Sequence, residues 1–196
     1  MTGIILAGGK NRRLGRDKAF LKTGNQTVLD RIIRLLSRIF EETLIVTDSP
    51  KLYRHLTARV VEDVIPNQGA LGGVYSGLFH SHTMHNFLVA SDMPFLNRDL
   101  IVYMKERTEG YDVVIPKTAL GYEPLHGFYS KNCLTVIKAE LERGNLRIAD
   151  FFDQVAVKFI EEEEVRRFDP QMLSFFNINT SEDLEKARKL HDQRGQ

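Results

Sequence analysis

The sequence predicts an α/β fold in which a mainly parallel sheet is flanked by helices. Short β-like runs alternate along the chain with helix-like segments, an order that favours parallel strands joined by crossover helices. Glycine-rich and acidic motifs directly follow several of the β-like runs, which is where open α/β sheets bind their ligands. No repeat, low-complexity stretch or Pro/Gly-rich linker divides the 196 residues, so we expect a single domain over residues 1–196.

The expected elements follow from local patterns. The first strand covers residues 2–7, and further strands are expected over 44–47, 60–62 and 87–91. Thr27 suits the N-cap of a helix. Its apolar positions recur at helical spacing: Leu29, Ile32, Ile33, Leu36, Ile39 and Phe40. Helices are also expected over 72–79 and 97–107, and Thr180 with Asp183 forms a capping-box-like start to a last helix.

Composition and charge exclude several classes of function. A formal net charge of +1 creates no field for binding nucleic acid or an acidic membrane, so we expect neither as a partner. The single cysteine, Cys133, cannot form an internal disulfide. The N-terminal region has neither an apolar signal core nor a span long enough for a bilayer. We therefore expect a cytoplasmic protein whose partners are ligands of a local site.

A glycine-rich loop follows the first expected strand, with the sequence LAGGKNRRLGRDKAFL over residues 6–21. Gly8 and Gly9 lack a Cβ, so the backbone can turn sharply and bring its N–H groups to phosphate oxygens. Arg13 can clamp a phosphate in a bidentate manner, and Lys18 supplies a compact point charge. A bare Gly-Gly turn with a solvated basic face is the simpler alternative. The spacing matches neither GxxxxGK[ST] nor GxGxxG, and the combination predicts a nucleoside triphosphate site.

Asp92 is the second informative residue, because it comes directly after the strand expected over residues 87–91. Mg²⁺ typically takes one or two protein carboxylates together with substrate phosphate oxygens, so one well-placed aspartate is sufficient. The alternative is that Asp92 caps the turn into the helix expected over 97–107. Three nearby histidines lack the spacing of a zinc site on a helix, and we assign them a structural role: His80, His82 and His85.

Two further segments carry polar residues in suggestive positions. Asp63 follows the strand expected over 60–62, and the segment NQGALGGVYSGL over 67–78 is a candidate loop for the base or the second substrate. Asp63 could equally form a turn. Near the C-terminus, Asn177 and Asn179 alternate with Phe176 and Ile178, so on a strand both amides would share one face.

These motifs together resemble the MobA-like family of nucleotidyltransferases, the molybdenum cofactor guanylyltransferases. The resemblance rests on the pattern LAGGxxxRLGxDKxxL, on the Asp92 turn, and on FFNINTSEDL over residues 175–184; Glu123-Pro124-Leu125 also resembles the family's Pro-Leu segment. The sequence departs from the usual pattern at Leu14, at Ala70, at Ser181 and at Asp48-Ser49-Pro50. The resemblance implies a Rossmann-like, nucleotide-diphospho-sugar transferase-like fold.

The resemblance also implies an activity: GMP passes from GTP to the terminal phosphate of molybdenum-molybdopterin, and pyrophosphate leaves. Asp92 would then bind Mg²⁺, with Mn²⁺ as an alternative, Asp63 would contact the base or the ribose of GTP, and Arg13 would steady the pyrophosphate. The remaining implied contacts are Leu6, Ala7, Gly8, Gly9 and Lys18 for the nucleotide, and Asn177 and Asn179 on the acceptor side, where the pterin is expected.

Other functions stay open at this point. A CTP-dependent molybdopterin cytidylyltransferase and a sugar-phosphate nucleotidyltransferase share the loop. A protein that binds GTP or molybdopterin without turnover is a third alternative. Molybdenum-insertion proteins and apo-molybdoenzymes would be further partners of a guanylyltransferase.

Overall fold

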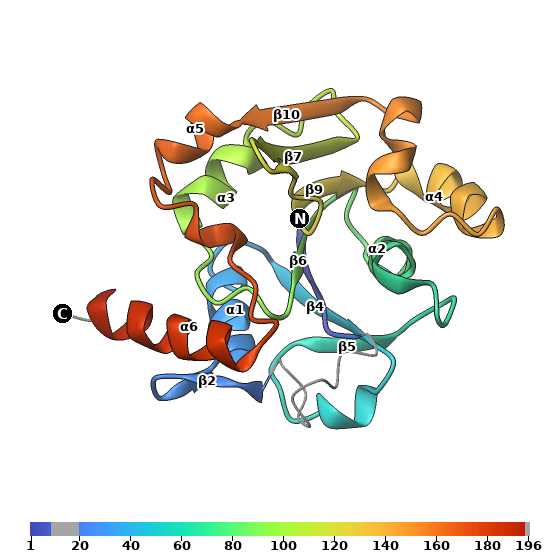
Figure 1. Cartoon of the computed structure of the whole chain (residues 1–196). Coiled ribbons are helices and arrows are strands. Elements are labelled where there is room, and N and C mark those ends of the chain that lie inside the picture. The colour runs from blue at the N-terminus through green and yellow to red at the C-terminus, as the bar shows by residue number, and fades with distance from the viewer. Residues whose placement is uncertain (9–19, 195–196) are drawn as a thin grey trace.

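The computed structural model describes residues 1–8 and 20–194, and it centres on a twisted, mainly parallel sheet (Figure 1). The strand order is β10-β7-β9-β6-β1-β4-β5, and β8 pairs with β7. Parallel pairs join β1 to both β4 and β6, β4 to β5, and β7 to β10, whereas β9 runs antiparallel to β6 and β7. The predicted α/β class with a mainly parallel sheet is confirmed.

The strands of this sheet are short. Their bounds are β1 (Thr2–Leu6), β4 (Glu42–Thr47), β5 (Arg59–Glu62), β6 (His85–Ala90), β7 (Val113–Thr118), β8 (Gly121–Tyr122), β9 (His126–Ser130) and β10 (Val157–Glu161). A separate two-stranded ribbon is formed by β2 (Lys22–Thr23) and β3 (Gln26–Thr27). The four expected strands are therefore present as β1, β4, β5 and β6, with bounds that differ by one or two residues.

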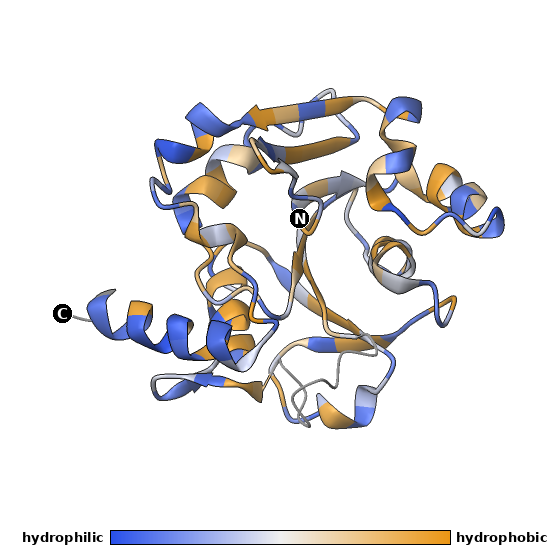
Figure 2. Ribbon diagram, in the orientation of Figure 1, coloured by the Kyte–Doolittle hydropathy of each residue, from blue (hydrophilic) through white to orange (hydrophobic). Residues whose placement is uncertain are grey.

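Helices cover both faces of the sheet. One face carries α1 (Val28–Leu36), α3 (Arg98–Lys105), α5 (Glu162–Arg166) and α6 (Ser181–Arg194), whose apolar residues join a single cluster. The opposite face carries α2 (Gly69–His80), α4 (Cys133–Glu142) and the 3₁₀ segment η3 (Ile148–Gln154), which pack in a second cluster. Two more 3₁₀ turns are η2 (Pro50–Leu52) and η4 (Leu173–Phe175). In Figure 2 the hydrophobic residues concentrate on the strands, while α6 is mostly hydrophilic.

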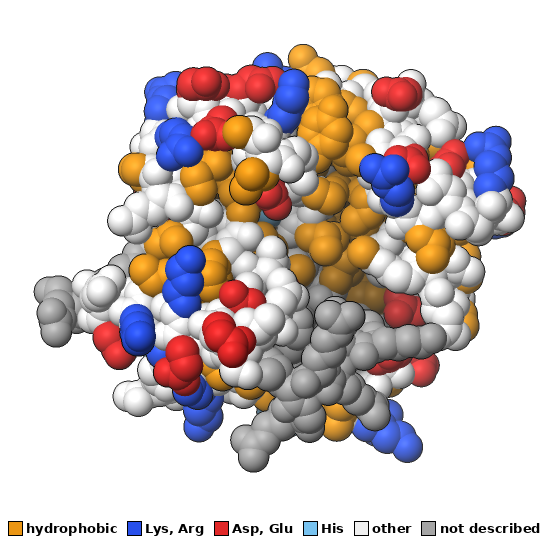
Figure 3. Space-filling view, viewed as in Figure 1, with side chains coloured by type: hydrophobic (Ala, Val, Ile, Leu, Met, Phe, Trp, Pro, Cys, Tyr) orange, Lys and Arg blue, Asp and Glu red, His pale blue; other side chains and the backbone are white. Residues whose placement is uncertain are grey.

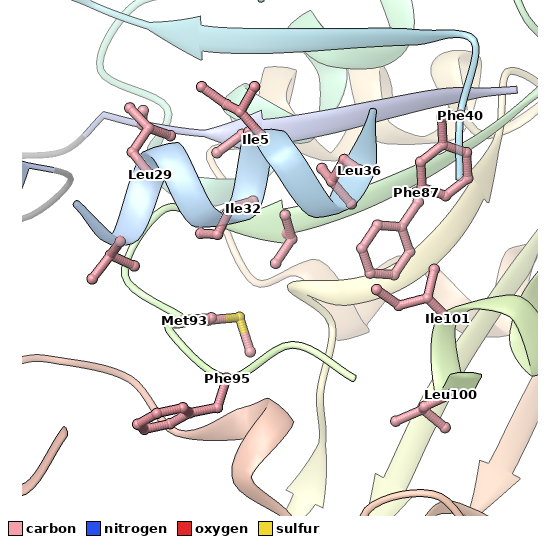
Figure 4. Packing of buried hydrophobic residues seen from close by; sticks show 14 of the residues in the cluster. Ile5, Leu29, Ile32, Leu36, Phe40, Phe87, Met93, Phe95, Leu100 and Ile101 are labelled. Carbon is pink, nitrogen blue, oxygen red and sulfur yellow. The ribbon is translucent and has the colours of Figure 1, made fainter. Parts of the chain in front are cut away.

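The cluster beneath α1 shows why this helix forms where it does. Leu29, Ile32 and Leu36 lie on one side of the helix and contact the sheet around Ile5 (Figure 4). All four side chains are buried, so their apolar surface is removed from water at a gain of roughly 25 cal/mol per Å². The helix therefore derives its stability from an amphipathic face rather than from its nine-residue length alone.

The starts of α1 and α6 are set by local side-chain chemistry, as the sequence indicated. The Thr27 hydroxyl accepts a hydrogen bond from the Asp30 amide at 3.0 Å and caps α1. At α6, the Thr180 hydroxyl accepts from the Asp183 amide at 3.1 Å, while the Asp183 carboxylate accepts from the Thr180 amide at 2.9 Å. Both predicted N-caps are confirmed.

Three boundary predictions were wrong for tertiary reasons. α1 ends at Leu36, so the apolar Ile39 and Phe40 pack from the following turn instead of continuing the helix. α2 begins at Gly69 rather than at residue 72, so most of segment 67–78 is helix rather than loop. Gly77 serves helix–sheet packing, because a Cβ at this position would lie 2.7 Å from Ile4 Cγ2.

The third correction concerns residues 176–179, which lie outside any strand. The expected alternation is seen only in part, because Ile178 is fully buried and Asn179 is exposed, whereas Phe176 and Asn177 are both half-buried. Asn177 donates from its side chain to the Phe175 carbonyl at 3.0 Å. This connection is thus held by a buried side chain and by local bonds rather than by a sheet ladder.

Candidate functional site

The candidate site lies at the carboxyl ends of the central parallel strands. β1, β4, β5 and β6 run in the same direction, so the residues that follow them gather at one edge of the sheet. The connections on the two sides of β1 cover opposite faces, since α1 packs in one apolar cluster and α2 in the other. Strand order therefore reverses between β1 and β6, and such a switch point leaves a crevice for a ligand.

The end of β1 forms one wall of this crevice. The Leu6 carbonyl accepts from the Ser91 amide at 3.1 Å, and the Ala7 amide donates to the Val46 carbonyl at 2.8 Å. The sheet thus engages the Ala7 amide, and the loop amides available to a phosphate begin at Gly8, which is exposed. A Cβ on Gly8 would lie 3.7 Å from the Asp48 amide nitrogen. Three predicted loop residues lie outside the described residues: Gly9, Arg13 and Lys18.

Asp92 lies at the end of β6, where buried neighbours hold its turn in place. Met93 and Phe95 are 2% and 6% exposed and insert into the cluster below α1 (Figure 4). The helix that follows has its own cap, because the Asn97 side chain accepts from the Asp99 and Leu100 amides at 2.9 and 3.0 Å. Capping of that helix therefore does not explain Asp92.

The C-terminal segment meets the Asp92 turn directly. The Ile178 amide donates a hydrogen bond to the Asp92 carbonyl at 3.0 Å, and the Ile178 side chain is fully buried. Asn177 and Asn179 flank this contact on either side. Two motifs far apart in the sequence are thereby brought together at the switch point.

Asp63 follows β5 at the other end of the crevice and is half-buried. Desolvation raises the pKa of its carboxyl group. The nearby Ser76 hydroxyl lowers that pKa, and the negative charge of Asp48 raises it. Its Oδ1 atom is buried without a hydrogen bond from the described residues. A buried acceptor in that state suits a ligand that brings N–H or O–H donors.

The described residues do not include a preformed metal cluster: residues 1–8 and 20–194 contain no group of three His, Cys, Asp or Glu side chains suited to hold an ion. One carboxylate with substrate phosphates is still compatible with Mg²⁺. The three histidines interact with protein groups instead. His80 and His85 bond to the carbonyls of Glu62 and Tyr111, and His82 bonds to Arg59.

The face that contains this edge is hollowed. Figure 3 shows a depression between the α6 side and the α2 side, with hydrophobic side chains along it. A separate cavity of about 450 Å³ runs along the outer side of α1, lined by residues that include Arg34, Ser37 and His55. None of the residues that line this cavity belongs to the predicted motifs or lies at the carboxyl edge. We therefore assign the site to the edge. Each helix of residues 1–8 and 20–194 is too short or too polar to cross a bilayer.

Comparison with known proteins identifies the family. The family model described as "MobA-like NTP transferase domain" matches residues 3–157, which include β1, Asp63 and Asp92. The chain belongs to the MobA-like NTP transferase family. The predicted resemblance is therefore confirmed.

MobA-like relatives align along almost the whole chain. A protein of Pelotomaculum thermopropionicum named probable molybdenum cofactor guanylyltransferase is 37% identical over 189 residues, covering 96% of this chain and 92% of that protein. The molybdenum cofactor guanylyltransferase of Desulfosudis oleivorans is also 37% identical, with 95% and 94% covered. The crystal structure of molybdopterin-guanine dinucleotide biosynthesis protein A from Archaeoglobus fulgidus superposes with a TM-score of 0.86 at 26% identity, covering 98% and 100%.

Two acidic residues near the carboxyl edge of the sheet were not assigned a role from the sequence. Asp48 follows β4 and acts on Asp63 through its charge. Glu123 precedes β9, and its segment contacts the end of β6, because the Ala90 amide donates to the Leu125 carbonyl at 3.3 Å. The available signal was the Glu123-Pro124-Leu125 motif, whose place beside β6 depends on strand pairing that the local sequence does not encode.

Proposed function

We propose that this chain is a nucleotidyltransferase that transfers GMP from GTP to the terminal phosphate of molybdenum-molybdopterin. The observation that carries the proposal is the meeting of three motifs at one switch point: the end of β1, the Asp92 turn and the Asn177–Asn179 connection. The names of relatives that match over more than nine-tenths of the chain support the same activity.

The nucleotide lies across the carboxyl edge from β5 to β6 in this proposal. Asp63 accepts hydrogen bonds from the guanosine part, either from the base N1–H and amino group or from the ribose hydroxyls. Leu6, Ala7 and Gly8 form the start of the loop that surrounds the phosphates, with Gly8 providing the first amide, and Gly9 continues the loop in the sequence. Lys18 neutralises charge near the α-phosphate, and Arg13 steadies the pyrophosphate.

Asp92 is the proposed protein ligand for Mg²⁺, or for Mn²⁺ in its place. Asp92 follows a buried strand, and the buried Met93 side chain anchors the backbone next to it. A divalent cation bound there would neutralise phosphate charge as it develops. The hard oxygen ligands of Asp92 and of the phosphates fit either cation.

The reaction itself needs positioning more than acid–base chemistry. An oxygen of the acceptor phosphate attacks the α-phosphorus of GTP, a new P–O bond forms, and the bond from the α-phosphorus to the bridging oxygen breaks. The electron pair leaves with pyrophosphate. A phosphate monoester has its second pKa at about 6 and is largely dianionic at neutral pH, so no general base is required. The protein contributes by holding both phosphates in line.

The acceptor approaches from the side of Asn177 and Asn179 in this proposal. Both amides can donate to and accept from a polar ring or a phosphate. The further partners that follow from the activity are molybdenum-insertion proteins upstream and apo-molybdoenzymes downstream.

The test is pyrophosphate release by the purified protein supplied with molybdenum-loaded molybdopterin, Mg²⁺ and one of GTP, CTP, ATP or UTP. We expect release with GTP, and none when Asp92→Ala replaces the wild-type protein. Release with CTP alone would move the protein to the cytidylyl branch. Tight GTP binding without release would identify a binding protein instead.

A further inference from the structure

The order of strands predicts from which side the acceptor must arrive. Asp63 follows β5 and Asp92 follows β6, with β4 and β1 between them. Three strand spacings of roughly 4.8 Å separate the two positions by about 14 Å. A nucleotide laid from Asp63 to Asp92 fills that part of the edge. The acceptor is then left with the other side of Asp92, toward β9 and β7.

Segment 123–125 occupies that side and is firmly attached. The Glu123 amide donates to the Pro116 carbonyl at 3.0 Å, and the Glu123 carbonyl accepts from the His126 amide at 3.0 Å. The Tyr129 hydroxyl donates to the Pro124 carbonyl at 2.6 Å. Together with the bond between Leu125 and Ala90, these contacts hold the segment between β7 and the end of β6.

The Glu123 carboxyl group takes no part in these contacts, which involve only backbone atoms of the segment. It is half-buried, and no hydrogen bond or ion pair to it comes from the described residues. Burial raises its pKa to about 7. Glu140 is the contrasting case: three side chains donate to its carboxylate, and bonds from Gln154 and Asn145 lower its pKa. Partial removal of a carboxylate from water without hydrogen bonds is unfavourable, so a ligand that brings N–H or O–H donors suits the position of Glu123.

An aromatic residue, Tyr122, directly precedes Glu123 in the sequence. Tyr122 is 42% exposed and stacks on Phe159, with ring centroids 5.0 Å apart and planes 13° apart. The residue next to Glu123 in the sequence thus presents a partly exposed aromatic ring, a surface on which a flat heterocycle can stack.

We propose that Glu123 recognises the pterin ring of the acceptor by accepting hydrogen bonds from its 2-amino group and the adjacent ring N–H. These two donors lie side by side and point in the same direction, so they match the two oxygens of one carboxylate as a guanidinium group does. This inference rests on the proposed function, because that function supplies a pterin as acceptor. Glu123 would thus set specificity for the ring, while the reacting phosphate stays near Asp92.

A kinetic experiment tests this role with an isosteric variant. Glu123→Gln keeps the shape but presents an NH₂ group that cannot accept from the pterin. We expect the KM for molybdenum-loaded molybdopterin to rise about tenfold or more, with the KM for GTP within about twofold of wild type. The matched control is Glu109→Gln, an exposed glutamate in a turn of the described chain, which should change neither value. An unchanged acceptor KM in Glu123→Gln would overturn the inference.

A binding experiment separates this inference from the proposed function. Pterin fluorescence is titrated with wild-type protein and with Glu123→Gln, and lumazine, which carries a carbonyl oxygen in place of the 2-amino group, is the comparison ligand. We expect wild type to prefer pterin about tenfold, and we expect the variant to lose that preference. Equal affinity for the two rings, or no saturable pterin binding to wild type at millimolar concentration, would overturn the inference. Wild type that prefers pterin but releases no pyrophosphate would reject the transferase activity and leave the role of Glu123 supported.

Discussion

The Ile178 amide donates a hydrogen bond to the Asp92 carbonyl at 3.0 Å, which joins the C-terminal connection to the turn after β6. Both sides of this contact are anchored in the same apolar cluster, through Met93 on one side and Ile178 on the other. The bond therefore sets the position of Asn177 and Asn179 relative to the proposed metal ligand.

Asp92→Ala is predicted to abolish metal-dependent turnover without unfolding the protein. The substitution removes a proposed metal ligand but leaves Met93 and Phe95 in the core. We expect pyrophosphate release to fall at least about 100-fold, while the melting temperature stays within a few degrees of wild type. Asp99→Ala, which replaces an exposed aspartate on α3, is the control. Full activity in Asp92→Ala would remove the metal assignment.

Asp63→Asn is predicted to weaken discrimination among nucleotides. The amide group offers one acceptor where the carboxylate offers two, and its NH₂ group opposes the donors of guanine. We expect the KM for GTP to rise about tenfold, with little change in kcat, because the interaction is made equally in the ground and transition states. Steady-state kinetics with GTP and ATP measures this. A fall in kcat alone would place Asp63 near the reacting phosphate instead.

His126→Leu is predicted to make the protein more resistant to acid. His126 is fully buried between the rings of Phe87 and Phe175, and neither ring nitrogen has a hydrogen-bond partner among the described residues. Burial lowers its pKa to about 3, and the charge of Asp169 offsets this only in part. Between pH 6.5 and about 3, His126 is therefore protonated in the unfolded chain but neutral in the folded protein.

The stability of the wild-type protein should fall through this window as the pH decreases. At one pKa unit per 1.36 kcal/mol, the loss attributable to His126 is about 2 kcal/mol at pH 5. Urea unfolding at pH 8 and pH 5 measures the difference. His126→Leu should show a smaller decrease in unfolding free energy, whereas the exposed His82→Leu should match wild type. Equal pH dependence in His126→Leu and wild type would contradict the assignment.

Glu123→Gln is predicted to be more stable than wild type at alkaline pH. The pKa of Glu123 in the folded protein, about 7, exceeds its ordinary value of 4.5, so the folded state holds a proton that the unfolded state releases. The unfolding free energy of the wild type should therefore decline as the pH rises from 4.5 through 7. Above that range it should decline no further on account of Glu123. After allowance for solvent screening, the gain in the variant is on the order of 1 kcal/mol at pH 8.5. Thermal melts at pH 5 and 8.5 test this, and a variant that is no more stable at pH 8.5 would count against burial of the carboxyl group.

Two glycines of α2 are predicted to respond in opposite ways to alanine. A Cβ on Gly77 would lie 2.7 Å from Ile4 Cγ2, so the helix must move away from β1, at a cost of about 1–3 kcal/mol. A Cβ on Gly73 would lie 3.4 Å from the Leu6 methyl groups, an ordinary contact. Gly73→Ala should therefore gain up to about 1 kcal/mol from helix propensity. Urea unfolding of both variants measures this, and equal effects would show that α2 can shift freely on the sheet.

Much of the site could be predicted because its chemistry is local. Gly8 and Asp92 directly follow apolar runs, and a residue after a parallel strand is placed at the sheet edge by the strand itself. The caps at Thr27 and Thr180 depend on neighbours three residues away, so their prediction was confirmed. The start of α2 was misplaced because Gly69 and Ala70 carry no apolar periodicity that marks a helix.

The sequence by itself determined the α/β class, the main strands and the residue types at their ends, because hydrophobic periodicity and capping operate within a few residues. Only the tertiary structure decided that β9 runs antiparallel beside β6, that residues 176–179 form no strand, and that Ile178 bonds to Asp92. These features depend on strand order and on burial of side chains that are distant in the chain. The lack of a hydrogen-bond partner for the Glu123 carboxylate among residues 1–8 and 20–194 was likewise decided by the tertiary structure, because it depends on how the surrounding elements pack.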